Sequence, residues 1–196
     1  MNNKTIYLAS RSPRRAELLQ QMGLNFTVLP SDVDETPLLD ELSHHYVVRL
    51  AAEKAQACFG KLRLDGAEIY PVLAADTTVS VDGRILGKPQ DDKEAFQMLS
   101  AMSGRWHEVH TGIAVATPEG VTTAISTTRV EMAKLSDAKI LAYVATGEPR
   151  DKAGAYGIQG LASTMIKRIE GSYSGVMGLP IYETAMLLEQ AGIRIL

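Results

Sequence analysis

Two long segments in which apolar and polar residues alternate constrain the fold of this chain most. They are HEVHTGIAVAT, residues 107–117, and VTTAISTTRVEM, residues 121–132, and they flank the turn Pro118-Glu119-Gly120. Alternation of this kind is typical of β-strands, and a short turn joins neighbouring strands in antiparallel order. The two segments therefore predict a long antiparallel pair around which the rest of the chain folds.

Outside this pair, strand-like and helix-like segments alternate, which indicates an α/β fold. Further strands are expected at residues 6–9, 25–30, 71–75 and 164–169. The apolar run PVLAA (residues 71–75) is typical of a strand buried on both faces, and Asp82-Gly83 in TVSVDGRIL suits the turn of a hairpin. Because the chain contains hairpins, we expect a mixed sheet flanked by helices rather than a parallel one.

Helix signals fill the spaces between these strands. Ser12, Ser43, Asp91 and Ser136 are expected N-caps, and Gly23, Gly60 and Gly104 stand near expected helix ends. A last helix is expected between Pro180 and Gly192. At 196 residues the chain is predicted to form a single domain, residues 1–196, with room for two small lobes around a cleft.

Composition excludes several classes of protein. A net charge of −3 and a pI near 5.8 argue against nucleic acid as the main partner. The N-terminus has no signal-peptide pattern and no stretch is long enough to span a bilayer, so we expect a soluble protein with no membrane partner. The single cysteine, Cys58, excludes an internal disulfide and fits a cytoplasmic location. It falls on an amphipathic helix, where a buried structural thiol is expected.

Basic residues cluster at the start of the first helix. In SRSPRRAELL, Arg11, Arg14 and Arg15 lie beside backbone N–H groups that have no acceptor within the helix. Cations are disfavoured at this end of the helix dipole unless an anion is bound there, and phosphate is the anion best suited to it. The alternative is a solvated basic face with an ordinary cap.

Asp76 follows the predicted buried strand and precedes Thr77 and Thr78. Catalytic groups collect at such strand ends in α/β sheets, so Asp76 is a candidate general base or metal ligand, or else only a cap on a turn. With the nearby acidic loop residues Asp32, Asp34 and Glu35, it would suit a hard cation such as magnesium. The four histidines lack the spacing of a zinc site.

Three other polar side chains are weaker candidates. Lys54 and Lys88 are expected to be solvated surface lysines unless both converge on the anion near Arg14. Gln159 stands among Gly154, Gly157 and Gly160 in DKAGAYGIQG, where backbone could approach a flat ligand. Its amide could read the edge of a nucleobase, although a structural turn is an equal alternative, and the pattern is neither a Rossmann nor a Walker A motif.

Several of these motifs together resemble one known family. LASRSPRRAELL, Glu35, the EKA at residues 53–55, AADT, GKP, DKAGAYGIQG and GSYSGVMGLP occur in the order found in the Maf family of nucleotide pyrophosphatases. The resemblance implies hydrolysis of nucleoside triphosphates to monophosphates and pyrophosphate with a divalent cation, magnesium or manganese. It also implies an inosine-triphosphatase-like α/β fold with two lobes around a cleft, and a homodimer.

The resemblance is to the branch of the family that prefers dTTP and UTP. Arg14, Thr77 and Gln159 match its specificity positions, whereas the tryptophan and glutamine of the branch acting on 7-methyl-GTP are absent. Asp76 corresponds to the proton acceptor, and Glu35 and Asp76 to metal-binding carboxylates. The residues that would bind substrate are Ser10, Arg14, Arg15, Glu35, Lys54, Thr77, Lys88 and Gln159.

The resemblance leaves some alternatives open. A departure from the family pattern, Trp106 in place of threonine, lies away from these motifs. Asp76 could act as the base, or could bind the metal while a metal-bound water attacks the α-phosphate. A non-catalytic nucleotide sensor and a nucleotidyltransferase are the competing functions. The sequence does not decide between canonical and modified pyrimidine nucleotides, and it gives no role in cell division.

Overall fold

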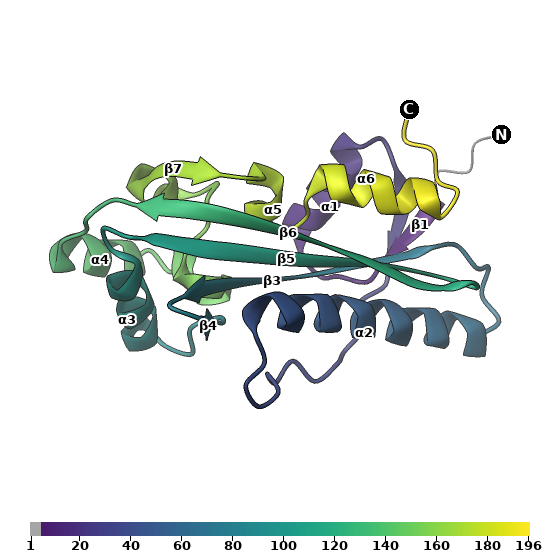
Figure 1. The fold of residues 1–196 in the computed structure, drawn as a ribbon, viewed down its shortest axis with the longest axis horizontal. Helices are drawn as coiled ribbons and strands as arrows, with labels where there is room; N and C mark the ends of the chain where they lie inside the picture. Colours follow the sequence, from purple (N-terminus) through teal and green to yellow (C-terminus); the bar gives the residue numbers. More distant parts are fainter. Residues whose placement is uncertain (1–4) are drawn as a thin grey trace.

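The computed structural model describes residues 5–196, which form one seven-stranded mixed sheet with helices on both faces (Figure 1). The strand order is β2-β1-β3-β5-β6-β7, and β4 pairs with β3 beside this path. The strands are β1 (Thr5–Leu8), β2 (Asn25–Val28), β3 (Val72–Val81), β4 (Arg84–Leu86), β5 (Trp106–Thr117), β6 (Gly120–Met132) and β7 (Ile166–Glu170). The α/β class and the mixed sheet are therefore confirmed.

The helices gather at the two ends of the long strands. They are α1 (Pro13–Gln21), α2 (Ser43–Leu64), α3 (Asp92–Met102), α4 (Asp137–Val144), α5 (Tyr173–Met177) and α6 (Ile181–Gln190), with 3₁₀ turns η1 (Glu148–Asp151), η2 (Ala153–Ala155) and η3 (Leu161–Met165). Figure 1 shows α2 on one face of the sheet, α6 on the other, and α3 and α4 near the far end. No helix among residues 5–196 is long and apolar enough to cross a membrane.

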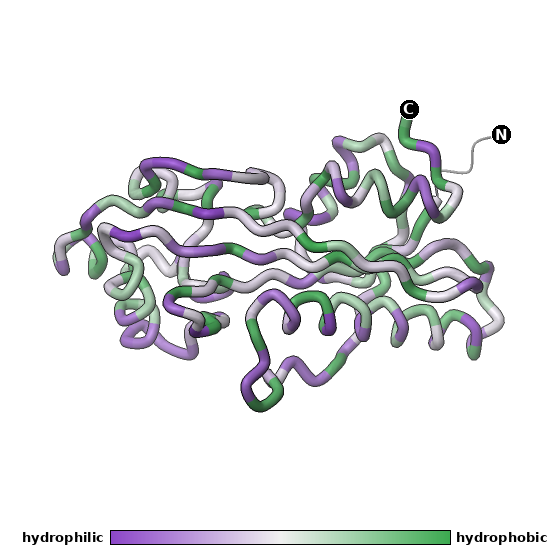
Figure 2. Tube along the Cα trace, in the orientation of Figure 1, coloured by the Kyte–Doolittle hydropathy of each residue, from purple (hydrophilic) through white to green (hydrophobic). Residues whose placement is uncertain are grey.

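The predicted antiparallel pair is the longest pairing in the sheet. β5 and β6 pair from Trp106↔Glu131 to Thr117↔Gly120, and β3 pairs with β5 from Val72↔Ala116 to Ser80↔Glu108. Alternate residues of β5 enter different cores: Ala114 and Ala116 pack with α2, whereas Ile113 and Val115 pack with α1 and α6. Figure 2 shows the apolar stretches of the strands between these helices. The alternating pattern thus buries both faces of the pair.

The predicted end of the central strand is wrong. We expected the strand to stop at Ala75, but β3 continues to Val81, so Asp76 lies within it, opposite Gly112. The polar residues after Ala75 alternate with apolar ones and keep pairing with β5. The parallel neighbour does stop early, because β1 pairs with β3 only at Tyr7↔Val72 and Leu8↔Leu73. Asp76 therefore lies just beyond the point where the sheet loses its parallel strand.

Local signals at the helix ends and turns have mixed outcomes. Asp91 and Ser136 cap α3 and α4 as predicted, by accepting hydrogen bonds from Glu94 N and Lys139 N. Asp82 and Gly83 adopt the positive φ values, 51° and 77°, of the expected hairpin turn. Ser12 stands at the N-cap of α1 but makes no side-chain cap bond. Two expectations for α2 are wrong: its N-cap is Leu42 rather than Ser43, and the helix passes Gly60 and ends at Leu64.

Gly112 allows α2 to approach the sheet closely. A Cβ atom at this position would lie 2.4 Å from the carbonyl oxygen of Val47, which belongs to α2. A side chain cannot move out of the way here, because the contacted atom is backbone. The absence of a side chain at Gly112 therefore sets the distance between α2 and the strand opposite Asp76.

We expect Gly112→Ala to lower the free energy of unfolding by roughly 1–3 kcal/mol, as overpacked cores do, because α2 has to move outward. Denaturant unfolding measures this change. Gly60→Ala is the matched control: Gly60 lies inside α2 with nothing within 4 Å of its would-be Cβ, so it should stabilise the protein slightly. Equal stability of the two variants would contradict the close packing.

Candidate active site

A cleft of about 830 Å³ opens beside Asp76, between the two groups of helices. Its walls come from the turn after β1, the loop after β2, α2, β3, and the glycine-rich segments before η3 and α6. Both of the predicted lobes therefore contribute residues to the walls of the cleft. Asp76 and all the residues expected to bind substrate line this cleft, the latter being Ser10, Arg14, Arg15, Glu35, Lys54, Thr77, Lys88 and Gln159.

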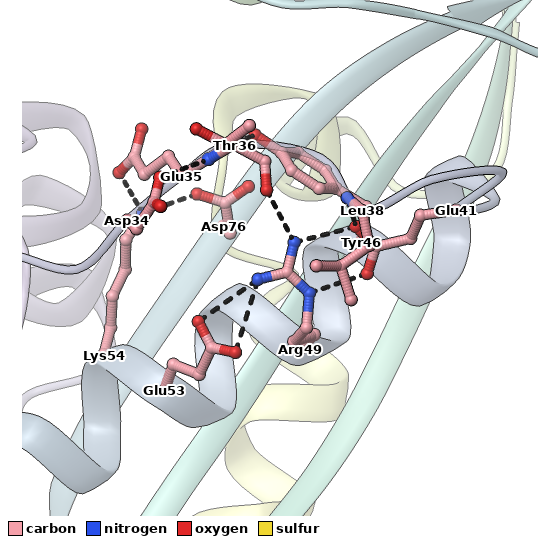
Figure 3. Close-up of polar contacts among 10 residues, drawn as sticks. All are labelled: Asp34, Glu35, Thr36, Leu38, Glu41, Tyr46, Arg49, Glu53, Lys54 and Asp76. Carbon is pink, nitrogen blue, oxygen red and sulfur yellow. Dashed lines mark hydrogen bonds and ion pairs between the residues drawn. The ribbon is translucent and has the colours of Figure 1, made fainter.

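Lys54 joins two carboxylates at the floor of the cleft. Its Nζ lies 2.6 Å from Oδ1 of Asp76 and 2.6 Å from Oε1 of Glu35. Lys54 and Asp76 are only 9% and 8% exposed, so the surface role considered for Lys54 is wrong. Figure 3 shows the contacts of Lys54 with Glu35 and Asp76. The lysine reaches Asp76 because α2 lies close against the sheet. The three side chains form one charged cluster from three separate elements of the fold.

The environment changes the acidity of both carboxyl groups. Burial raises the pKa of Asp76, and the positive charges of Lys54 and Arg15 oppose part of that shift. Burial also favours the neutral form of Glu35, but the hydrogen bond and charge of Lys54 outweigh it and lower the pKa of Glu35. Of the two groups, Asp76 is thus the stronger proton acceptor, which suits a general base.

A second network holds the acidic loop against α2. Arg49 donates two hydrogen bonds of 2.7 Å to the two carboxylate oxygens of Glu41 and one of 3.2 Å to the carbonyl of Thr36 (Figure 3). The hydroxyl of Tyr46 donates to the carbonyl of Glu35 at 2.8 Å. These contacts fix the backbone that carries Glu35. Sequence reasoning missed Arg49 and Tyr46, although a basic residue on the helix after an acidic loop was a usable signal.

The arginines at the start of the first helix contact different groups. Arg15 donates to the carbonyl of Gly178 at 2.8 Å, to Oγ of Ser10 at 3.1 Å and to Oγ1 of Thr77 at 3.2 Å. Burial lowers the pKa of Arg15. Arg11 pairs with Asp32 at 2.9 Å, and both side chains are exposed. Arg15 therefore holds the walls of the cleft together, and its contact with substrate stays a prediction.

Three of the side chains expected to bind substrate have no protein partner. Within residues 5–196, the side chains of Arg14, Lys88 and Gln159 make no hydrogen bond or ion pair, and they come from three different segments around the cleft. Lys88 and Gln159 are exposed, and Arg14 is partly buried. Two cations and one amide are thus available for a ligand that carries several negative charges and a hydrogen-bonding ring.

The carboxylates fit a hard cation only in part. No group of three or more His, Cys, Asp or Glu side chains among residues 5–196 is placed to hold a metal ion. Glu35 and Asp76, however, supply two carboxylates at one point, and magnesium is commonly held by one or two carboxylates together with substrate phosphates and water. The donor set therefore fits a magnesium-like ion that is bound together with a phosphorylated ligand.

Two buried histidines and the cysteine are structural. His107 is buried, its Nε2 lies 2.7 Å from the hydroxyl of Tyr156, and burial lowers its pKa to about 4. His110 is buried with Nδ1 2.9 Å from Oγ1 of Thr127. The thiol of Cys58 is buried against the carbonyl of Leu29 at 3.4 Å, and burial raises its pKa to about 11. The expectation of a buried structural thiol is confirmed.

Together, the mixed sheet and the charged cleft define an α/β enzyme that acts on a phosphorylated substrate. The chain belongs to the Maf family: the family model for Maf-like protein matches residues 5–191. This result confirms the resemblance carried by the motifs.

Curated relatives cover nearly the whole chain. A dTTP/UTP pyrophosphatase of Methylobacillus flagellatus is 64% identical over 196 residues, which are 100% of this chain and 96% of that protein. A dTTP/UTP pyrophosphatase of Nitrosomonas europaea is 50% identical, covering 97% and 96% of the two chains. A nucleoside triphosphate pyrophosphatase of Haemophilus ducreyi is 48% identical, covering 99% and 98%.

One solved structure is distantly similar. The Ham1 protein of Staphylococcus aureus matches 66% of this chain and 72% of its own with 18% identity and a TM-score of 0.45.

Proposed function

We propose that this protein is a nucleoside triphosphate pyrophosphatase that hydrolyses dTTP and UTP to the monophosphate and pyrophosphate. The printed names of its relatives support this activity. The observation that carries the proposal is the arrangement of the cleft, in which unpartnered Arg14, Lys88 and Gln159 surround a buried Asp76. Two cations suit the phosphates, and an amide suits a pyrimidine edge.

In the proposed reaction, Asp76 accepts a proton from the water that attacks the α-phosphate. Lys54 engages Oδ1 of Asp76 and so keeps the carboxylate in place, while Oδ2 is left to take the proton. A new P–O bond forms, the bond between the α-phosphorus and the bridging oxygen breaks, and pyrophosphate leaves. Arg14 and Lys88 neutralise the charge that develops on the leaving phosphates.

Glu35 would hold the divalent cation, magnesium or manganese, together with phosphate oxygens. Asp76 would be its second ligand in the alternative reaction in which Asp76 is not the base. A bound cation supplies charge neutralisation and can lower the pKa of a water ligand. Lys54 bonds to both carboxylates, so its single positive charge offsets part of their negative charge whether or not a cation is present.

Pyrophosphate release from a panel of nucleotides tests the proposal. With magnesium, we expect dTTP and UTP to be hydrolysed and CTP, ATP and GTP to be poor substrates. Binding of dTTP without turnover would instead indicate a nucleotide sensor. Pyrophosphate release with the nucleotide transferred to an acceptor would indicate a nucleotidyltransferase. Either result would overturn the proposed reaction.

Lys88→Ala should weaken the binding of dTTP about tenfold and that of dTMP much less, because the lysine is proposed to contact the departing phosphates. Equilibrium binding of both nucleotides measures the difference. Lys93→Ala is the control, since Lys93 is an exposed lysine of α3 outside the cleft. Equal losses for dTTP and dTMP would place Lys88 away from the triphosphate.

Three broader expectations stay predictions. They are a single domain over residues 1–196, a homodimer and a cytoplasmic location. Size-exclusion chromatography with light scattering tests the dimer.

A further inference from the structure

A pair of hydroxyl groups lies at the wall of the cleft in cross-strand register. Thr77 of β3 pairs with Thr111 of β5, and their Oγ1 atoms are 2.9 Å apart. Thr77 lines the cleft, whereas Thr111 is 0% exposed and does not. Thr111 can therefore influence a ligand only through the groups that it contacts, which are the Thr77 hydroxyl and the carbonyl of Gly175.

The neighbours of the pair determine which hydroxyl donates. Oγ1 of Thr111 lies 2.8 Å from the carbonyl oxygen of Gly175, and a carbonyl can only accept. The single hydroxyl hydrogen of Thr111 is therefore used, so in the bond between the threonines Thr77 must be the donor. The guanidinium of Arg15 donates to Oγ1 of Thr77 at 3.2 Å and occupies one lone pair.

This arrangement leaves Thr77 with no hydrogen to offer and one lone pair free. A hydroxyl group ordinarily rotates and can donate or accept as its ligand requires. Here Thr111, which lies behind the wall of the cleft, takes the hydrogen, and Arg15 occupies one lone pair, so the hydroxyl cannot rotate freely. Thr77 thus presents an acceptor to any bound molecule.

We propose that Thr111 is a positioning residue that holds the Thr77 hydroxyl as a hydrogen-bond acceptor toward a donor of the bound nucleoside. The identity of the ligand rests on the proposed function. A pyrimidine nucleotide offers two such donors: the N3–H group, present in uracil and thymine but absent from cytosine, and a sugar hydroxyl. If the donor is N3–H, cytosine is rejected, because the lone pair of its N3 atom would face the free lone pair of the Thr77 hydroxyl.

Binding of nucleoside monophosphates tests this proposal without any turnover. For the full-length protein and for Thr111→Val and Thr111→Ser, the affinities of UMP and CMP are compared, and those of dTMP and 3′-deoxythymidine monophosphate. We expect Thr111→Val to reduce one of the two affinity ratios about tenfold, because the freed Thr77 hydroxyl can then donate as well as accept. Thr111→Ser keeps the hydroxyl and should keep both ratios.

The ratio that changes identifies the donor: the first pair reports the base and the second the sugar. Unchanged ratios in a folded Thr111→Val protein would overturn the proposal. If that variant does not fold, Thr77→Val removes the acceptor directly, and unchanged ratios there would also overturn it. A ratio that is clear in the wild type and reduced in Thr111→Val, in a protein that releases no pyrophosphate, would contradict the proposed hydrolysis and still support the role of Thr111.

Discussion

Asp76→Asn should lower turnover of dTTP by at least ~10²-fold, the usual contribution of a general base. The amide keeps the shape of the side chain but cannot take the proton of the attacking water. The fold should survive, because the amide oxygen can still accept the hydrogen bond from Lys54, which also keeps its ion pair with Glu35. Steady-state pyrophosphate release gives the turnover, and thermal unfolding gives the stability.

Asp137→Asn is the matched control for this substitution. Asp137 is an exposed aspartate in the first turn of α4, and it lies outside the cleft. Its turnover should stay close to that of the wild type. Near-normal turnover of Asp76→Asn would remove Asp76 from the reaction, both as base and as metal ligand.

Removing divalent cations should lower the activity by ~10²-fold or more, and adding magnesium or manganese should restore it. A triphosphate and two carboxylates at one point bring several negative charges together, and a hard cation with oxygen ligands neutralises them. The assay is pyrophosphate release in EDTA, followed by back-titration with each metal.

The stability of the protein should change little in the same experiment, since Lys54 pairs with both carboxylates in any case. Thermal unfolding with and without EDTA checks this point and shows that lost activity is not lost structure. Full turnover in EDTA would exclude a required metal. Rescue by zinc alone would contradict the hard oxygen donors assigned to the site.

Features that depend on neighbouring residues in the sequence were predictable. The Asp82-Gly83 turn, the cap at Asp91 and the long β5–β6 pair follow from local chemistry and from alternation, and the structure confirms them. The end of β3 was not predictable in the same way. Asp76 and Thr77 look like a break between the buried strand and the hairpin at Asp82-Gly83, and only their pairing with β5 joins the two segments into one strand.

The chemistry of the site depends on contacts between distant segments, which a single sequence does not contain. Lys54 resembled a surface lysine because nothing near it in the sequence indicates that Gly112 lets its helix lie close to Asp76. Arg15 resembled a phosphate ligand, yet its acceptors are on Ser10, Thr77 and Gly178. The family motifs identified which residues line the cleft. They did not show which of these residues contact the ligand and which hold other residues of the cleft in place.

The long strands have a consequence for motion. Enzymes that close around a ligand usually rotate two parts about a few hinge residues. Here β3 and β5 run without interruption from one group of helices to the other, hydrogen-bonded from Val72↔Ala116 to Ser80↔Glu108. Such a continuous ladder resists bending, so we expect the width of the cleft to change little when the nucleotide binds. Any adjustment during turnover should then lie in the segments that line the cleft outside this ladder.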